Sequence, residues 1–379
     1  MSQSTTPATT HVANSDDLAN QPLVSVIVAC RNEERFISRC LESIFASDYP
    51  KDKLEVLVID GCSTDGTRAV VEAWSVKYPC VRLFANRQMI TPVAFNIGVD
   101  HARGDLIMIM SAHATYDTDA IRNCVQHSLG YNADNVGGIW KIEARDSGLI
   151  ADAIVVALSH RFGVGGGLYR TTKTRDFRWV DTAAFGCYRR EVFQRIGKYN
   201  EQLLRNQDLE LNLRLKMAGG ATLLAPDVVI HYSARTDIKT FCKHSFQDGL
   251  WVILSFAYSK VMPVSQRHLV PLALVSSLLT FGAAALAIKP AGYAFVVIAG
   301  LYACANLVSS FIAAIQQKKI GLVFVLPAIF TLLHVSYGLG SLWGCVKLIL
   351  TGKWNKFFSL IWAHRLAPKR LPVISHPIK

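Results

Sequence analysis

Two long stretches without a charged residue lie in the C-terminal part of this chain, and they constrain its fold more than any other feature. Residues 269–288 and 291–315 contain no Asp, Glu, Lys or Arg, and Lys289-Pro290 separate them. A helix of about 20 apolar residues is long enough to cross a hydrocarbon core of about 30 Å. The sequence therefore predicts a hairpin of two transmembrane helices.

A third uncharged stretch, 321–346, can be interpreted in two ways. It contains residues that often interrupt a helix or are rare in a membrane: Pro327, His334, Gly338 and Gly340. One continuous crossing would carry the basic end of the chain outside, against the positive-inside rule, whereas a re-entrant or broken pair of helices would keep it inside. We expect the second arrangement, with 268–350 as the transmembrane helices and 351–379 as a basic cytosolic tail.

Charge and composition agree with a membrane protein that faces the cytosol. Only 18% of the residues are charged, yet the formal net charge is +12. Basic residues beside apolar stretches indicate anionic lipid headgroups rather than nucleic acid, for which the sequence carries no binding motif. Lys318-Lys319 follow the second stretch, and the nine cysteines include no Cys-x-x-Cys pair, which favours a reducing compartment. We expect a multi-pass protein of the cell (inner) membrane with its N-terminal domain in the cytoplasm.

The rest of the chain alternates short β-branched runs with amphipathic stretches over 22–232, which predicts an α/β domain with a mainly parallel sheet. The predicted strands are 24–29, 54–59, 81–85 and 106–110, and the predicted helices between them are 36–46, 64–77 and 92–102. Residues 1–21 are polar and lack a signal peptide, so we expect a disordered leader. Residues 233–267 predict an amphipathic interfacial helix, with a core-packing helix as the alternative.

Polar side chains follow three of the predicted strands. Arg31-Asn32-Glu33 follow the first, Asp60 and Ser63-Thr64-Asp65 follow the second, and Ser111-Ala112-His113 follow the fourth. Open α/β sheets bind ligands at the carboxyl ends of their strands. A carboxylate at Asp60 can accept a hydrogen bond from a base N–H or a ribose hydroxyl, whereas an acid such as Asp65, taken alone, is more often an N-cap.

The order of these motifs resembles a known family. Three segments resemble the nucleotide-sugar half of the family 2 inverting glycosyltransferases: VSVIVACRNEERFISRCLESI, VLVIDGCSTDGT and PVAFNIGVDHARGD. A later segment resembles their acceptor half: WVDTAAFGCYRREVFQRIGKYNEQLLRNQDLELNLRLKMAGG. The stretches with SAHATY and HVSYGLG are most similar to membrane-anchored, succinoglycan-type exopolysaccharide glycosyltransferases. The resemblance covers about 22–260 and implies a GT-A fold, a Rossmann-like nucleotide-diphospho-sugar transferase domain, over 22–232.

Carried over position by position, the resemblance implies a donor site made of Glu33, Asp60, Asp65, Asn96 and Ser111. Glu33 and Asp60 would contact the nucleoside, and Asp65 would support their loop. The family usually has Asp-x-Asp after its fourth strand, where a divalent cation, Mn²⁺ or Mg²⁺, bridges the diphosphate oxygens. This chain departs from the family there.

Ser111-Ala112-His113 replace the two carboxylates at that position. A neutral imidazole can bind Mn²⁺, although one histidine is a poorer ligand for a hard cation than a carboxylate. We expect His113 to be a metal or diphosphate ligand, with His231 as a second ligand or a phosphate donor. The alternative for His113 is a polar side chain at the end of a strand with a structural partner.

The acceptor half implies a general base at Asp208, because Gln207-Asp208 stand where the family has a Glu-Asp pair. Asp208 would take the proton of the acceptor hydroxyl as that oxygen attacks the anomeric carbon, a direct displacement that inverts configuration. Glu210 is the alternative base, and an N-cap is the alternative role of Asp208.

Gln247 and Trp251 match the spacing of the Gln-x-x-Arg-Trp motif of processive synthases and are predicted to contact the acceptor or the diphosphate. Leu250 replaces the arginine of that motif, which favours transfer of a single sugar over processive synthesis.

We therefore expect transfer of one sugar from a nucleotide-sugar to a lipid-linked (polyprenyl-diphosphate) glycan in exopolysaccharide or surface polysaccharide biosynthesis. Two alternatives stay open. A polyprenyl-phosphate sugar synthase would use the lipid phosphate as its acceptor and would need no strong base. A non-catalytic, membrane-anchored protein that binds nucleotide-sugars as a scaffold would explain the missing Asp-x-Asp.

Overall fold

A computed structural model describes residues 21–171, 176–259 and 266–354. The strands are β1 Val24–Cys30, β2 Leu54–Asp60, β3 Val81–Ala85, β4 Leu106–Ser111, β5 Ala114–Tyr116, β6 Asn135–Ala144, β7 Arg178–Val180, β8 Cys187–Arg189 and β9 Thr222–Ala234. The helices before the apolar region are α2 Glu34–Phe45, α3 Thr67–Lys77, α4 Thr91–His101, α5 Ala120–Gly130, α6 Leu149–Ser159, α7 Arg161–Val164, α8 Leu168–Thr171, α9 Arg190–Ile196, α10 Gln207–Met217 and α11 Ile238–Tyr258. The predicted leader and almost all of the predicted basic tail lie outside the described residues.

Within the described residues the strands form one nine-stranded sheet, in the order β3-β2-β1-β4-β8-β6-β9-β5 with β7 beside β9. β1 runs parallel to β2 and β4, and β6 runs parallel to β9. β8 is antiparallel to both β4 and β6, so β6 and β9 point in the same direction as β1. The carboxyl ends of β1, β2, β4, β6 and β9 therefore lie at one edge of the sheet. The four predicted strands and three predicted helices are confirmed to within a few residues, and the sheet is mixed rather than mainly parallel.

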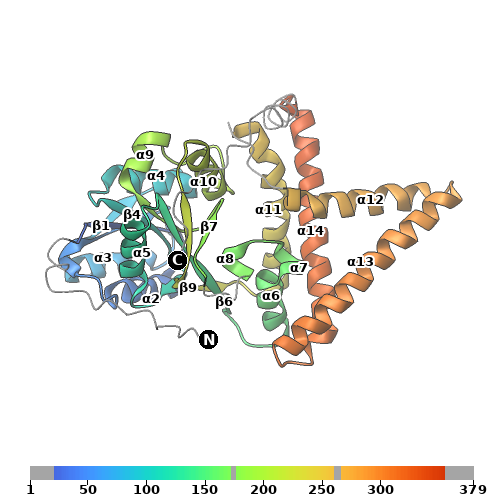
Figure 1. The fold of residues 1–379 in the computed structure, drawn as a ribbon, viewed down its shortest axis with the longest axis horizontal. Coiled ribbons are helices and arrows are strands. Elements are labelled where there is room, and N and C mark those ends of the chain that lie inside the picture. The colour runs from blue at the N-terminus through green and yellow to red at the C-terminus, as the bar shows by residue number, and fades with distance from the viewer. Residues whose placement is uncertain (1–20, 172–175, 260–265, 355–379) are drawn as a thin grey trace, which may run out of the picture.

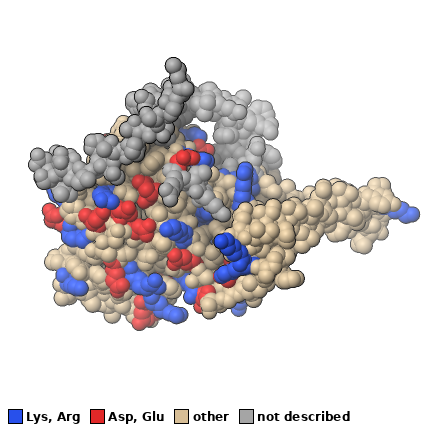
Figure 2. Space-filling view, turned by 60° about the horizontal axis from the view of Figure 1, so that its bottom comes forward, with Lys and Arg blue, Asp and Glu red and all other residues tan. Residues whose placement is uncertain are grey.

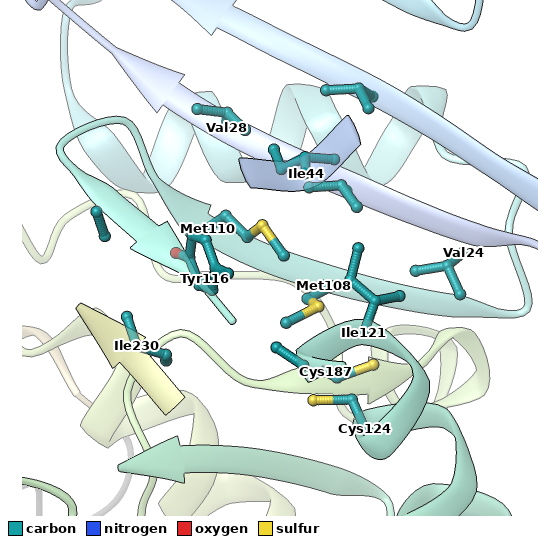
Figure 3. Close-up of a cluster of buried hydrophobic side chains, with 14 of the residues drawn as sticks. Val24, Val28, Ile44, Met108, Met110, Tyr116, Ile121, Cys124, Cys187 and Ile230 are labelled. Atoms are coloured by element: carbon teal, nitrogen blue, oxygen red, sulfur yellow. The ribbon is translucent and has the colours of Figure 1, made fainter. Parts of the chain in front are cut away.

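Both faces of the sheet are covered by helices, because its central strands are apolar on both sides. On one face, side chains from β1, β4, α2 and α5 meet in a buried cluster that includes Val24, Val28, Met108, Met110, Ile44 and Ile121 (Figure 3). On the other face, α4, α9 and α10 pack against Ile27, Leu57 and Ile107. These two layers hold the strand ends in place, so the loops that follow the strands form a defined edge.

The apolar C-terminal region consists of α12 Val270–Ala284, α13 Lys289–Gln316 and α14 Leu322–Leu350. Three helices of the described residues are long and apolar enough to cross a membrane by length and composition: Arg267–Ala284, Lys289–Gln316 and Leu322–Leu350. α12 and α13 project from the molecule as an arm, whereas α14 runs beside α11 (Figure 1). The two helices of the arm carry one charged residue, Lys289 at the start of α13, and Figure 2 shows the far end of the arm in blue.

α14 is one continuous helix, so the predicted break in 321–346 is wrong. Pro327 lies in the second turn, where a missing N–H removes one backbone hydrogen bond without ending the helix. Gly338 and Gly340 serve close packing instead of interrupting the helix. A Cβ on Gly340 would lie 1.9 Å from the carbonyl oxygen of Phe246 in α11, so only glycine lets the two helices approach this closely.

Candidate functional site

The loops that follow β1 and β2 are joined to each other by hydrogen bonds. The Asn32 N–H donates to the Ser63 hydroxyl at 2.9 Å, and the Glu33 N–H donates to the Thr67 hydroxyl at 2.8 Å. In return, Asn32 Oδ1 accepts from the Thr64 N–H at 2.8 Å. Asn32 has φ 54°, a left-handed conformation that asparagine tolerates better than most residues. The two loops therefore form one rigid wall at the edge of the sheet.

Asp60 and Asp65 have different surroundings in this wall. Asp60 is 2% exposed at the end of β2, and it accepts hydrogen bonds from the Ser63 N–H at 3.2 Å and from the Ser63 hydroxyl at 2.5 Å. Asp65 is exposed and accepts from the N–H and hydroxyl of Thr67 and from the Glu34 N–H. The Thr67 hydroxyl holds the pKa of Asp65 below its usual value. These bonds tie Asp65 to the start of α2, and the predicted roles of Asp65 and Asp60 at the donor stay predictions.

Glu33 lies at the centre of a group of basic side chains. Its carboxylate is 3.2 Å from His113 Nδ1, 3.7 Å from Arg235 Nη2 and 3.9 Å from Arg145 Nη2. Glu33 itself is 6% exposed. The structure thus brings together the predicted residues Glu33 and His113, and it adds two arginines that the sequence analysis missed.

Arg145 and Arg235 follow the carboxyl ends of two adjacent parallel strands. Ala144 at the end of β6 is in register with Ala234 at the end of β9, so the next residue of each strand reaches the same edge. The signal that could have revealed them is the Ala-Arg pair that closes each strand. The two Ala-Arg pairs indicate a shared site only once the two strands are known to be neighbours. The sequence does not show this, because the strands lie far apart in it.

His231 does not join His113. Its Nδ1 lies 2.7 Å from Glu143 and its Nε2 lies 3.0 Å from Asp117, so both ring nitrogens have a carboxylate partner. The ring of the next residue, Tyr232, packs against the His113 ring with 5.1 Å between centroids. Neighbouring residues of a strand project to opposite faces, so His231 points away from His113.

The residues present do not fit the divalent cation that the resemblance implies. In the described part of the chain, no group of three or more His, Cys, Asp or Glu side chains is placed to hold a metal ion. The position of the expected Asp-x-Asp supplies only His113, and two guanidinium groups lie within 4 Å of its carboxylate partner Glu33. Guanidinium groups repel a cation and provide no lone pair to it. His113 and His231 as metal ligands therefore stay predictions without geometric support.

Asn96 and Ser111 are buried among protein partners. The Asn96 amide donates to the Tyr199 carbonyl oxygen at 2.9 Å and to Glu201 Oε1 at 2.8 Å, and its oxygen accepts from the Tyr199 N–H at 2.9 Å. Ser111 is 5% exposed at the end of β4, and its N–H donates to the Tyr116 hydroxyl at 2.8 Å. These contacts show Asn96 holding the segment before α10, and donor binding by either residue stays a prediction.

Asp208, the predicted general base, lies in the first turn of α10. It is half-buried, and its Oδ1 has no hydrogen-bond partner in the part of the chain that the structure describes. Burial raises the pKa of Asp208 to about 7, partly offset by the nearby Tyr199 hydroxyl. A carboxylate whose pKa lies near neutral pH combines a useful ionised fraction with a strong pull on a proton.

Glu210, the alternative base, is bonded through one of its two carboxylate oxygens, and its Oε2 has no hydrogen-bond partner among the described residues. It is 2% exposed, and its Oε1 accepts from Arg214 Nε at 2.8 Å one helical turn along. Arg214 also donates to the Lys198 carbonyl oxygen at 2.7 Å. This chain of contacts ties α10 to the preceding loop. Asp208 as the base, with Glu210 as the alternative, stays a prediction.

Gln247 on α11 is bonded to an arginine that the sequence analysis did not consider. Arg205 Nη2 donates to Gln247 Oε1 at 3.0 Å, and Arg205 Nη1 bonds to Asp248. A guanidinium group is thus present beside Gln247 although position 250 is leucine. Trp251 is half-buried on the same helix and lies 6.4 Å from the Tyr258 ring. Acceptor or diphosphate contact by Gln247 and Trp251 stays a prediction.

Comparison with known proteins agrees with this geometry. Residues 25–197 match the model of glycosyl transferase family 2. One relative, from Methanococcus voltae, is 30% identical over 236 residues. Its name is dolichyl N-acetyl-alpha-D-glucosaminyl phosphate 3-beta-D-2,3-diacetamido-2,3-dideoxy-beta-D-glucuronosyltransferase. The match covers 60% of this chain and 71% of the relative. The succinoglycan biosynthesis protein ExoA of Rhizobium meliloti (strain 1021) is 27% identical over 272 residues, and the match covers 71% of this chain and 80% of ExoA.

Among solved structures, the mannosyltransferase PcManGT from Pyrobaculum calidifontis, in complex with GDP-Man and Mn²⁺, is similar with a TM-score of 0.57. It is 22% identical, and the match covers 86% of this chain and 88% of PcManGT. This likeness shows a shared fold. The sheet, the polar strand ends and the matched relatives together establish that this chain belongs to glycosyl transferase family 2, with a GT-A domain followed by helices long and apolar enough to span a membrane.

Proposed function

We propose that this protein transfers one sugar, with inversion, from a nucleotide-sugar to a hydroxyl group of a lipid-linked glycan at the cytosolic face of the inner membrane. The observation that carries the proposal is Asp208, a half-buried carboxylate with a pKa near 7 in the acceptor half of the domain. Two relatives support it by name, one with a dolichyl-linked acceptor and one in succinoglycan biosynthesis. A polysaccharide of the cell surface is the expected product class.

In the proposed reaction, Asp208 accepts the proton of the acceptor hydroxyl as its oxygen attacks the anomeric carbon. The bond between that carbon and the donor diphosphate breaks on the opposite side, so configuration inverts and a nucleoside diphosphate leaves. One base is enough for a single displacement. A phosphate acceptor would arrive already ionised, so the raised pKa of Asp208 favours the hydroxyl over the alternative of a polyprenyl-phosphate sugar synthase.

The donor nucleoside is proposed to lie against the wall formed by the β1 and β2 loops. Asp60 there accepts from a base N–H or a ribose hydroxyl, while Asp65 and Thr67 keep the wall rigid. The proposed chemistry draws no step from a divalent cation, because the residues after β4 do not form a site for one.

The proposed enzyme turns over its donor only when a lipid-linked acceptor is supplied. Purified full-length protein in nanodiscs is mixed with UDP- or GDP-sugars and with a lipid-linked glycan fraction, and release of nucleoside diphosphate is measured. We expect release with one nucleotide-sugar class and a labelled lipid product. Binding of a nucleotide-sugar without any product, with every acceptor fraction tried, would favour the scaffold alternative.

We further propose that α12 and α13 cross the membrane as a hairpin while α14 lies along the catalytic domain. Only 6% of the apolar window of α12 and 11% of that of α13 are buried inside the protein, against 39% for α14. α14 contacts α6, α7 and α11 as well as α12 and α13, and Lys319 just before it pairs with Asp152 of α6 at 2.7 Å. Of the three apolar helices, α14 packs most against elements that precede the arm, which supports its lying beside them rather than crossing.

This arrangement predicts that both ends of the chain lie on the same side of the membrane. Alkaline phosphatase, which is active only outside the cytoplasm, is fused after residue 379 or inserted at Lys289 between α12 and α13. We expect activity at Lys289 and none at the C-terminus, where a green fluorescent protein fusion is fluorescent. Active phosphatase at the C-terminus would show instead that α14 crosses.

A further inference from the structure

We propose that Arg145 and Arg235 bind the diphosphate of the donor and take the place of the divalent cation that the family uses. This inference rests on the proposed function, since it concerns the same nucleotide-sugar. It follows from the mismatch between the residues after β4 and a metal site, and from the two arginines that the fold brings to that place.

The backbone places the two guanidinium groups side by side. β6 and β9 pair in parallel up to Ala144 and Ala234, and the Arg145 N–H donates to the Ala234 carbonyl oxygen at 3.2 Å. Both arginines thus leave the sheet at its ligand-binding edge. Figure 1 shows β6 and β9 next to each other on the side of the sheet nearer the apolar helices.

The Arg145 side chain is held in position before any ligand binds. Its Nε donates to the Ser233 carbonyl oxygen at 3.1 Å, and its guanidinium carbon lies 4.0 Å from the centre of the Phe36 ring. These two contacts fix the plane of the guanidinium group. Its Nη2 is buried and has no hydrogen-bond partner among the described residues.

The cationic charge of the two arginines is only partly used by protein groups. Each lies 3.7–3.9 Å from Glu33, which is an ion-pair distance but too long for a hydrogen bond. Two further acids lie within two residues of these arginines in the sequence, Asp146 and Asp237, and both carboxylates have other partners. Asp146 accepts from the Thr236 hydroxyl at 2.9 Å, and Asp237 accepts from the Thr240 N–H at the start of α11.

This arrangement suits a diphosphate. A guanidinium group presents paired N–H donors that match two phosphate oxygens, and such charge-assisted hydrogen bonds are among the strongest in proteins. During transfer the electron pair of the breaking bond between anomeric carbon and oxygen passes to the diphosphate, whose charge therefore grows. Two fixed cations beside it stabilise that charge, while the acceptor proton goes to Asp208.

The test measures nucleotide binding, which does not require a known sugar or acceptor. Full-length protein in detergent is titrated with UDP, GDP, UMP and GMP, with either EDTA or Mn²⁺ present. The variants are Arg145→Gln and Arg235→Gln. The matched control is Arg68→Gln on α3, which removes a guanidinium group that pairs with Glu72 on the exposed surface.

We expect one diphosphate to bind with an affinity that differs less than about threefold between EDTA and Mn²⁺. Each of the two variants should lower that affinity by about tenfold or more, as expected for a lost charge-assisted bond. The affinity for the monophosphate, which lacks the outer phosphate, should change little in these two variants. Arg68→Gln should bind the diphosphate like the wild type. Arg235 is half exposed, so its variant keeps the test valid if Arg145→Gln unfolds.

Two results would overturn the inference while leaving the proposed function standing. The first is diphosphate binding that strengthens more than about tenfold with Mn²⁺. The second is wild-type diphosphate affinity in both arginine variants. If no nucleotide binds the wild type under any condition, the proposed function fails together with the inference. This result is distinguishable from the other two, because in both of them the wild type binds a nucleoside diphosphate.

Discussion

Asp208→Asn is expected to reduce sugar transfer by about 10²- to 10⁴-fold without unfolding the protein. The amide has nearly the same shape as the carboxylate but cannot accept the proton of the acceptor hydroxyl. Turnover of the donor with a lipid-linked acceptor measures the loss, and nucleotide binding should persist because Asp208 belongs to the acceptor half. A nearly silent substitution would point to an acceptor that needs no base, such as a lipid phosphate.

The pH dependence of this enzyme follows from the same residue. Burial raises the pKa of Asp208 to about 7, so the active carboxylate forms as the pH rises through 7 and kcat should climb there. The native pKa lies above the unfolded value of about 3.9, so this group weakens the folded state progressively as the pH rises from about 4 to 7. Asp208→Asn removes that penalty, and its unfolding temperature at pH 8 should be no lower than that of the wild type.

Glu210→Gln is the matched control for the base. It lies two residues along the same helix, and its carboxylate is buried against Arg214 at 2.8 Å. Weakening this pair should lower the unfolding temperature while the surviving folded protein keeps most of its turnover. The reverse pattern, with activity lost in Glu210→Gln and kept in Asp208→Asn, would make Glu210 the base.

Gly340→Ala is expected to separate α14 from α11 and to destabilise the protein strongly. The new Cβ would lie 1.9 Å from the Phe246 carbonyl oxygen. Because that oxygen belongs to the backbone of α11, no flexible side chain can move aside to make room. Overpacking of this kind costs about 1–3 kcal/mol and more where the backbone must shift. Thermal unfolding of the detergent-solubilised protein measures it, and we expect a fall of at least several degrees.

Gly300→Ala provides the comparison on a neighbouring helix. Gly300 lies in α13, and a Cβ there meets nothing within 4 Å. Alanine favours helix over glycine by about 1 kcal/mol, so this variant should unfold at the same temperature or slightly higher. An equal fall in unfolding temperature in both variants would mean that small residues are needed throughout the apolar helices. The close approach of α11 and α14 would then not be the cause.

The local pattern of the sequence was sufficient for much of the fold. Strands such as Val24–Cys30 and Leu54–Asp60 are short, β-branched and buried on both faces, which is a signal contained within a few residues. The apolar helices are equally local, because length and absence of charge are enough to recognise them. The motif order around Asp60, Asp65 and Asp208 likewise pointed to the family, and the comparisons bear that family out.

The break predicted in 321–346 failed for a physical reason. Proline and glycine were interpreted by their effect on an isolated helix, whereas their effect here depends on a partner. Gly338 lies close to Val275 and the Pro271 carbonyl oxygen, and Gly340 lies close to Phe246, so these glycines are contact points between helices. A sequence shows that a residue is small, but only the packing shows what approaches it.

The sequence by itself determined the GT-A domain, the apolar arm and the candidate base, because each depends on a continuous run of residues. Only the tertiary structure decided which polar groups meet. It separated His231 from His113, because His231 and Tyr232 are neighbours on β9 that project to opposite faces and Tyr232 is the one that packs against His113. It also brought Arg145 and Arg235 together around Glu33. Contacts between distant segments depend on strand order and register, and these are set by the packing of the whole sheet.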